Sequence, residues 1–264
     1  MSYRLRECQE VVTVVVTLLA HGCPLQAIVA AFGLDERTVA DWQRRAGQHC
    51  QKVHEHLAET PRDLGQVQAD EIRVKVQKEK GGHGNSCGGV VWMALALMVR
   101  TRLWLGGEVS CHRDTSLITR LVERVRAGAT KSSVRKTPPL FCTDGLCTYV
   151  GAIGKVFRDP VSTGQRGRPR LHSWKGVLVA QVVKRYEKRR VIEVEHRIKQ
   201  GSPQRGQEVI AASQGQGTSN TAFIERLNAT FRERLACLVR RGRALARHTQ
   251  TLQQGMFLVG TWAP

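Results

Sequence analysis

Two aspartates stand at positions where a purely structural role would be awkward. Asp70 lies in the alternating segment 66–77 and shares a strand face with Ile72, so we expect it to point toward the apolar side of a sheet. A buried carboxylate destabilises a fold unless it is paired or binds a metal. Asp144 directly follows the apolar run Leu140–Thr143, which places it at the carboxyl end of a predicted strand, where ligands bind in open α/β sheets.

A third carboxylate, Glu225, lies in a segment with helical periodicity, residues 220–241. Apolar residues such as Phe223 form one stripe of this helix. At the angular spacing of an α-helix, Glu225, Asn228 and Arg232 fall together on an adjacent polar face. The sequence therefore offers two strand aspartates and one helical glutamate that a fold could bring together.

Each carboxylate also has an ordinary explanation. Asp70 could pair with a buried arginine, Asp144 could cap the following helix, and Glu225 could be solvated. Together, however, they match the chemistry of phosphodiester cleavage, in which two Mg²⁺ ions about 3.5–4 Å apart activate the nucleophile and stabilise the leaving oxygen. Mg²⁺ prefers oxygen ligands and takes few carboxylates. The set predicts an enzyme with two Mg²⁺ ions as cofactor, Mn²⁺ being the alternative ion.

The charge balance indicates a polyanionic partner. The chain has 264 residues, and its 41 Lys and Arg against 22 Asp and Glu give a net charge of +19. Cations that meet phosphates release condensed counterions, so such an excess favours DNA binding, although a generally basic protein is the alternative. Residues 1–65 are nearly neutral, and the basic excess is concentrated in residues 160–241.

The order of predicted elements indicates a mixed α/β fold. Segments 66–77, 90–99 and 103–110 predict three consecutive strands joined by hairpins. Asp114 caps an amphipathic helix, and parallel crossovers are expected after it. The remaining predicted elements are a strand at 140–143, a helix at 149–157, an exposed loop at 160–173, strands at 177–184 and 190–198, and helices at 220–241 and 244–261.

The first 50 residues predict three helices, at about 11–20, 24–32 and 36–45. A glycine-containing turn at Gly33 joins the second helix to the third, which resembles a helix-turn-helix. We therefore expect a DNA-binding domain at 1–50, a linker at 51–65 and a catalytic domain at 66–264. A small helical domain used for dimerisation is the alternative for the first 50 residues.

The cysteines and the apolar runs indicate the compartment. Eight cysteines occur without a CxxC pair or a secretory signal, which favours free thiols in a reducing environment. The longest apolar runs are too short to span a bilayer. We expect a cytoplasmic protein.

Three segments of the chain resemble bacterial insertion-sequence transposases of the DDE superfamily. They are Gln-Ala-Asp70-Glu-Ile, Cys-Thr-Asp144-Gly-Leu and Asn220-Thr-Ala-Phe-Ile-Glu225-Arg-Leu-Asn228. The resemblance implies an RNase-H-like, integrase-type core in which Asp70, Asp144 and Glu225 are the catalytic, metal-binding triad. It further implies strand cleavage and strand transfer of a mobile element, a homo-oligomer on DNA, and Arg232 contacting terminal DNA phosphates.

The remaining DNA contacts are expected on basic residues outside the triad. Arg37, at the start of the third helix, could reach base edges in a major groove. The sequence Arg166-Gly-Arg168-Pro169 is similar to the arginine fork of minor-groove binders, although a flexible basic loop is the alternative. The other predicted contacts are Arg44, Arg45, Lys184, Arg185, Asn228, Arg240 and Arg241.

Two other functions are compatible with the same residues. A non-catalytic helix-turn-helix regulator, derived from a decayed transposase, would bind DNA without cutting it. An RNase-H-like nuclease would cut DNA without joining strands.

Overall fold

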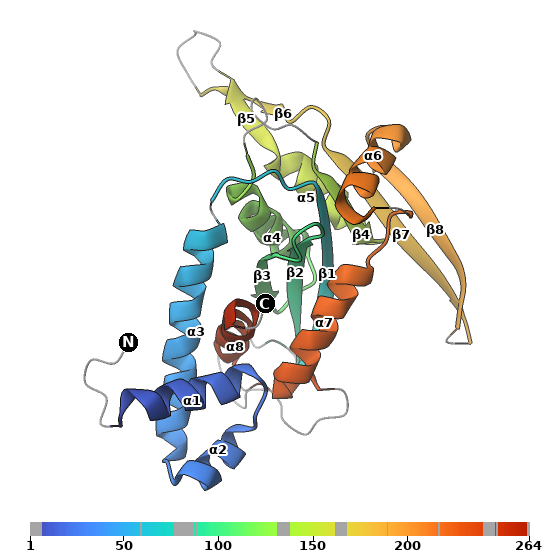
Figure 1. Ribbon diagram of the computed structural model, residues 1–264. Coiled ribbons are helices and arrows are strands. Elements are labelled where there is room, and N and C mark those ends of the chain that lie inside the picture. The colour runs from blue at the N-terminus through green and yellow to red at the C-terminus, as the bar shows by residue number, and fades with distance from the viewer. Residues whose placement is uncertain are drawn as a thin grey trace.

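Six strands form one mixed sheet at the centre of the structure (Figure 1). The structure is a computed structural model that describes residues 7–58, 60–76, 87, 89–130, 138–161, 168–188, 190–215, 217–239, 246 and 248–262. The strands lie in the order β3 (Trp104–Ser110), β2 (Val90–Met98), β1 (Gln66–Lys75), β4 (Leu140–Asp144), β7 (Leu178–Glu187) and β8 (Arg190–Gln200). Strands β1, β4 and β7 are parallel, and the other neighbours are antiparallel.

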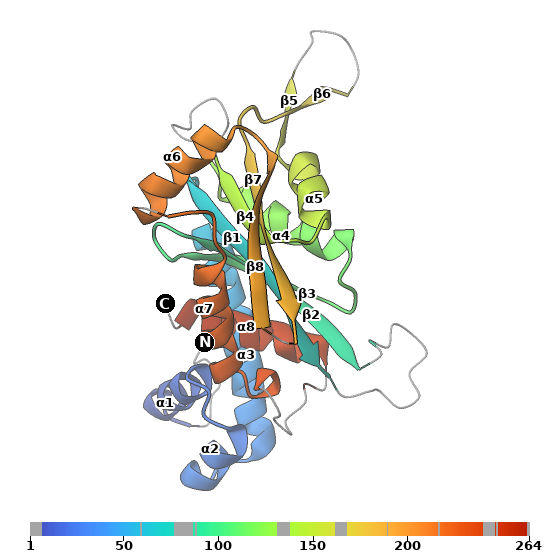
Figure 2. The ribbon, with the colours of Figure 1, turned by 90° about the vertical axis from the view of Figure 1, so that its right-hand side faces the viewer.

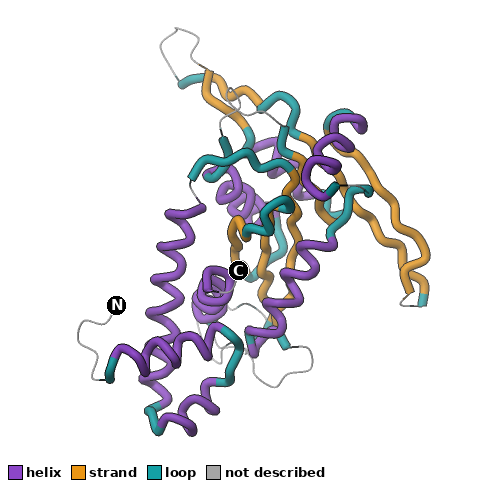
Figure 3. The backbone as a smooth tube through the Cα atoms, viewed as in Figure 1, coloured by secondary structure: helices purple, strands orange, loops and turns teal. Residues whose placement is uncertain are grey.

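Helices cover both faces of the sheet (Figure 2). On one face lie α4 (Thr115–Ala127) and α5 (Thr148–Val156), and on the other lie α6 (Pro203–Gln214), α7 (Ala222–Arg234) and α8 (Thr249–Trp262). The helices α1 (Gln9–Ala20) and α3 (Glu36–Ala58) pack beside α8, and α2 (Leu25–Phe32) packs against α3 (Figure 3). The predicted α/β class, with a mixed sheet and flanking helices, is confirmed.

The period of two along β1 distributes its side chains between two cores. Val67 and Ala69 belong to the core formed with α4 and α5. Ile72 and Val74 belong to the core formed with α7, α8 and the N-terminal helices. Because both faces are covered, β1 is buried over most of its length, which explains why its alternation does not separate apolar from solvated residues.

The three N-terminal helices form where the sequence predicts them. Gly33 ends α2 in the left-handed conformation, with φ of 65°. Asp35 then caps α3, since its Oδ1 accepts hydrogen bonds from the N–H groups of Arg37 (2.8 Å) and Thr38 (3.3 Å). The expected linker at 51–65 is wrong in its first half, because α3 continues to Ala58 while it packs along α8.

Several other elements differ from the sequence-based expectation. The predicted loop 160–173 contains parts of a two-stranded hairpin, β5 (Arg158–Val161) and β6 (Arg170–Ser173). The helix expected at 220–241 stops at Arg234 and is followed by the 3₁₀ turn η1 (Ala236–Leu238), and α6 was not predicted. No helix in the described ranges combines the length and the apolar character needed to cross a bilayer.

The sequence predicts free thiols, but two of the eight cysteines are paired in the structure. Cys87 and Cys111 form a disulfide, with their Cα atoms 4.9 Å apart. These residues lie near the ends of β2 and β3, which the antiparallel pairing brings together. The other six cysteines are free.

The close approach of α3 to α8 gives a stability test. A Cβ added at Gly47 would lie 2.5 Å from the backbone oxygen of Gln254, so we expect Gly47→Ala to lower the free energy of unfolding by about 1–3 kcal/mol. Gly151 in α5 meets no atom within 4 Å, so the same change there should stabilise the protein by roughly 0.5–1 kcal/mol through helix propensity. Urea denaturation measures both, and stabilisation by Gly47→Ala would contradict this packing.

Candidate active site

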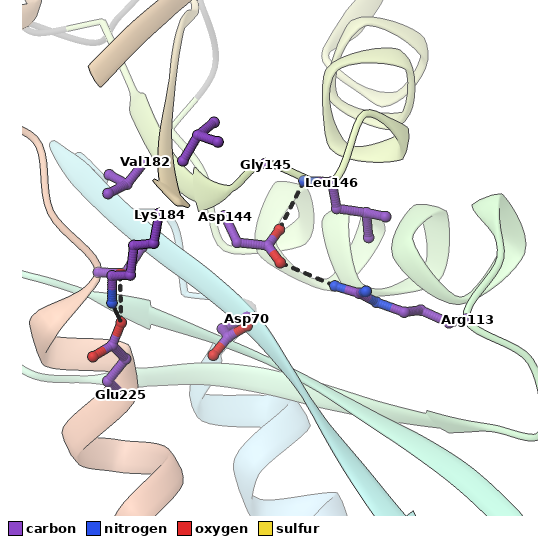
Figure 4. Close-up of a pocket in the computed structure, with 10 residues that line it drawn as sticks. Asp70, Arg113, Asp144, Gly145, Leu146, Val182, Lys184 and Glu225 are labelled. Carbon is purple, nitrogen blue, oxygen red and sulfur yellow. Dashed lines mark hydrogen bonds and ion pairs between the residues drawn. The ribbon is translucent and has the colours of Figure 1, made fainter. Parts of the chain in front are cut away.

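Strand pairing places Asp70 and Asp144 side by side. In the parallel pair of β1 and β4, Ala69 lies beside Thr143, so the residues that follow them are neighbours (Figure 4). Carboxylate oxygens of Asp70, Glu71 and Asp144 can lie within 4.8 Å of one another. The predicted convergence of the two strand aspartates is therefore present in the fold.

Asp70 is a half-buried carboxylate held by two hydrogen bonds. Its Oδ2 accepts from Asn228 Nδ2 (2.8 Å) on α7, and its Oδ1 accepts from the N–H of Glu71 (2.8 Å). Burial, followed by the negative charges of Glu71, Asp144 and Glu225, raises the pKa of Asp70 to about 6. The site thus concentrates negative charge where few neighbouring groups neutralise it.

Glu225, in the first turn of α7, lines one pocket together with Asp70 and Asp144. Its Oε1 accepts from Lys184 Nζ (2.5 Å) on β7 and from Thr221 Oγ1 (2.8 Å). Burial alone would raise the pKa of Glu225, but the hydrogen bonds from these two side chains and the charge of Lys184 outweigh it and lower the pKa. Glu225 therefore stays ionised on the opposite side of the pocket from Asp144 (Figure 4).

The start of α7 is held by Gln68, a fully buried residue two positions before Asp70. Its Oε1 accepts from the N–H groups of Phe223 and Ile224 (3.0 Å each), and its Nε2 donates to Asn220 Oδ1 (3.1 Å). The first N–H groups of a helix have no partner within it, so this side chain acts as a cap supplied by another element. Gln68 begins the segment Gln-Ala-Asp70-Glu-Ile, but no role was predicted for it.

Glu71 points to the opposite face of β1, and its side chain is fully buried. Its Oε2 accepts from Arg113 Nε (2.9 Å) and Nη2 (2.6 Å), and its Oε1 accepts from Tyr149 Oη. The same Arg113 Nη2 donates to Asp144 Oδ2 (3.0 Å). Glu71 is thus buried against Arg113 and Tyr149 and does not line the pocket, which makes it a positioning residue rather than a good metal ligand.

Asp70, Asp144 and Glu225 line a pocket of about 500 Å³ at the end of the parallel strands. Asp144 is held in it by Arg113 and by the N–H of Leu146, which donates to Asp144 Oδ1 (3.0 Å). The lining residues are Asp70, Arg113, Asp144, Gly145, Leu146, Val182, Val183, Lys184, Thr221 and Glu225. Three carboxylates and two cations share this space, which suits binding of a divalent ion and of a phosphate.

Some predicted DNA contacts lie at the pocket and others do not. Lys184 lines it, Asn228 bonds to Asp70, and Arg232 lies farther along the same helix. Arg185 forms an ion pair with Glu193 (3.2 Å) on β8. Arg37, Arg44 and Arg45 lie on α3, which contributes nothing to the pocket, and Arg168 is exposed before β6. Arg166, Arg240 and Arg241 lie outside the described residues.

Arg44 and Arg45 on α3 share one carboxylate partner, Asp41. Arg44 Nη2 lies 2.5 Å and Arg45 Nη1 lies 3.9 Å from the carboxylate of Asp41. Arg37 is exposed at the start of the helix. The major-groove role of this helix therefore stays a prediction.

The ion pair between Arg113 and Glu71 predicts strong coupling. We expect Arg113→Met to lower the free energy of unfolding by roughly 2–3 kcal/mol, since a buried carboxylate loses its partner while the one-third exposure of Arg113 limits the loss. The double variant Glu71→Gln/Arg113→Met should be more stable than Arg113→Met, because no unpaired charge remains. Denaturation at neutral pH measures both variants and Glu71→Gln alone. A loss in the double variant equal to the sum of the two single losses would show that the pair is not coupled.

The raised pKa of Asp70 predicts a pH-dependent stability of the metal-free protein. Its folded pKa of about 6 exceeds its ordinary value of 3.8, so the folded state holds this proton more tightly, and ionisation destabilises the fold as pH rises between these values. In EDTA above pH 6 we expect Asp70→Asn to be more stable than wild type by roughly 1–3 kcal/mol.

The replacement at Asp70 can keep its hydrogen bonds. Within the described residues Asn228 Oδ1 has no partner, so rotation of that amide would offer an acceptor to the introduced asparagine. The gain should disappear below about pH 4, where both states of wild type are protonated. Thermal unfolding at both pH values measures the difference, and an unchanged gain at low pH would remove the electrostatic explanation.

The chain was also compared with known proteins. No protein-family model matches it, and no curated protein matches it in sequence. Function is therefore inferred from the residues of the pocket and from their geometry.

Proposed function

We propose that the chain is a DNA transposase of the DDE type, which cuts and rejoins DNA strands by metal-dependent phosphoryl transfer. The observation that carries the proposal is the convergence of Asp70, Asp144 and Glu225 on one pocket, from β1, β4 and α7. The pocket belongs to a chain with a net charge of +19. Clustered carboxylates in a protein that attracts polyanions are what metal-assisted chemistry on DNA requires.

The arrangement of the elements supports an RNase-H-like core. An antiparallel β3-β2-β1 meander is followed by the parallel strands β4 and β7, as the resemblance implies. The two aspartates lie on the adjacent strands β1 and β4. The glutamate lies on the later helix α7, which covers the face of the sheet toward which Asp70 points. Strand β8 extends this core by one further antiparallel strand.

The donor set fits divalent magnesium. Asp70, Asp144 and Glu225 provide hard oxygen ligands around one pocket, and burial together with the neighbouring negative charges raises the pKa of Asp70. These three side chains would hold the metal ions, which when bound lower the pKa of water and polarise a phosphoryl oxygen. Glu71 would not take part, since its side chain is fully buried against Arg113 and Tyr149 and does not line the pocket.

The two cations of the pocket have roles of their own. Arg113 fixes the orientation of Asp144 through a hydrogen bond of 3.0 Å while it is anchored by Glu71. Lys184 does the same for Glu225 at 2.5 Å. Both line the pocket, so they are also placed to contact a DNA phosphate that enters it.

Binding to double-stranded DNA is proposed for a wider surface. Helices α2 and α3 would read the terminal inverted repeats of the element, with Arg37 exposed at the start of α3. Lys184, Asn228 and Arg232 would contact DNA near the cleaved strand. Target DNA would be the second substrate, and the joining of two ends would require a homo-oligomer.

The test is divalent-metal-dependent cleavage and joining of DNA that carries the ends of the element. We expect Asp144→Asn to lose activity by roughly a hundredfold or more, since metal coordination is worth several kcal/mol in the transition state. Asp159→Asn is a matched control, because Asp159 also pairs with an arginine, Arg126, and is similarly exposed (34% against 37%) but lies outside the pocket. DNA binding should persist in both variants.

The outcomes separate the rival functions. Binding without cleavage by wild type would favour a regulator, and cleavage without joined products would favour a nuclease. Cleavage that survives Asp144→Asn would show that the pocket is not the active site. Calorimetric titration with Mg²⁺ gives an independent readout, since binding should require the same three carboxylates.

A further inference from the structure

Strand β8 forms an edge of the sheet (Figure 2). It pairs with β7, and within the described part of the chain no other strand pairs with it. The strand is long and mostly exposed, and it carries Val194 (44% exposed) and Ile198 (37%) on the face that α6 and α7 cover elsewhere. Long edge strands with exposed apolar residues are templates for pairing with another chain.

The charges of β8 are segregated along its length. Its first half carries Glu193 and Glu195, and its second half carries Arg197 and Lys199. Glu193, Glu195 and Arg197 share one face, and Lys199 follows as the extra residue of a β-bulge. In an antiparallel pair of two identical strands, the acidic half of each meets the basic half of the other. The charge pattern is thus complementary to itself.

We propose that β8 binds β8 of a second copy of the chain in antiparallel pairing, centred on His196, so that one continuous sheet runs through a two-fold symmetric dimer. The proposal does not depend on the reaction proposed above. Such a contact is isologous, since each strand offers the same surface to the other.

The register centred on His196 matches the side chains on both faces. On one face Glu195 lies opposite the partner's Arg197, and Glu193 lies next to the partner's Lys199, the extra residue of the β-bulge. Each pair occurs twice by symmetry. On the other face Val194 lies opposite the partner's Ile198. Cross-strand pairs of opposite charge and of apolar side chains are those that stabilise antiparallel sheets.

Neighbouring registers are disfavoured. Centring the pair on Glu195 places the two Glu195 side chains against each other, and centring it on Arg197 does the same with two arginines. Centring the pair on Val194 places Glu193 against the partner's Glu195. Like charges directly opposite each other destabilise a sheet, so the sequence of β8 selects one register.

Existing ion pairs extend into the proposed interface. Arg185 Nη1 on β7 lies 3.2 Å from Glu193 Oε2, and Arg197 Nη2 lies 2.5 Å from Glu195 Oε2. In the dimer, Glu195 would lie between Arg197 of its own strand and the partner's Arg197, and Glu193 would keep Arg185. These carboxylates therefore keep their present partners, and Glu195 gains another across the interface.

The test is the oligomeric state of the full chain without DNA, measured by sedimentation velocity from about 1 to 100 µM, the range expected for an interface of modest size. We expect wild type to dimerise. Glu195→Lys and Arg197→Glu should each raise the dimer dissociation constant roughly tenfold or more, because two opposite-charge pairs become like-charge pairs. The double variant Glu195→Lys/Arg197→Glu should dimerise as wild type does.

Mixing the two single variants gives the sharpest readout. In a mixed dimer the introduced lysine meets the introduced glutamate, and Arg197 of one chain meets Glu195 of the other, so dimers should return. Glu123→Lys, an equal charge change on the exposed face of α4, should leave the dissociation constant unchanged. A monomeric wild type at the highest concentration, or dimers that ignore the single changes, would overturn the proposal.

Discussion

The contact between Gln68 and the start of α7 is the interaction on which the candidate site depends. Gln68 is fully buried, and its amide binds the N–H groups of Phe223 and Ile224 as well as Asn220. It supplies to α7 the cap that the helix lacks, since Thr221 makes no side-chain capping bond. Glu225 lies in that first turn, so the bond that caps the helix also sets the distance of the third carboxylate from β1.

Strand β1 carries two consecutive carboxylates with different roles. Asp70 faces α7 and remains open to the pocket, while Glu71 faces α5 and is enclosed by Arg113 and Tyr149. Arg113 links the two environments, because it also binds Asp144. Burial raises the pKa of both carboxylates, but only Glu71 is paired with an arginine and excluded from the pocket. The strand thus separates a ligand-binding carboxylate from a structural one.

Much of the site could be predicted from local pattern. Alternation placed Asp70 on an apolar strand face, an apolar run placed Asp144 at a strand end, and helical spacing placed Asn228 beside Glu225. Other features had weaker signals. Ser202 and Pro203 mark the start of α6, which no apolar stripe revealed, and the continuation of α3 past residue 50 depends on its packing against α8. The Cys87–Cys111 pairing depends on the register of β2 and β3.

The sequence by itself determined most of the strands and helices along the chain, the basic charge and the three carboxylates, because these follow from local periodicity and composition. Only the tertiary structure decided which groups surround those carboxylates. Arg113, Lys184 and Gln68 come from separate elements, and their contacts span long stretches of chain. Local pattern carries no information about such partners, since strand order and helix placement are set by packing across the whole sheet.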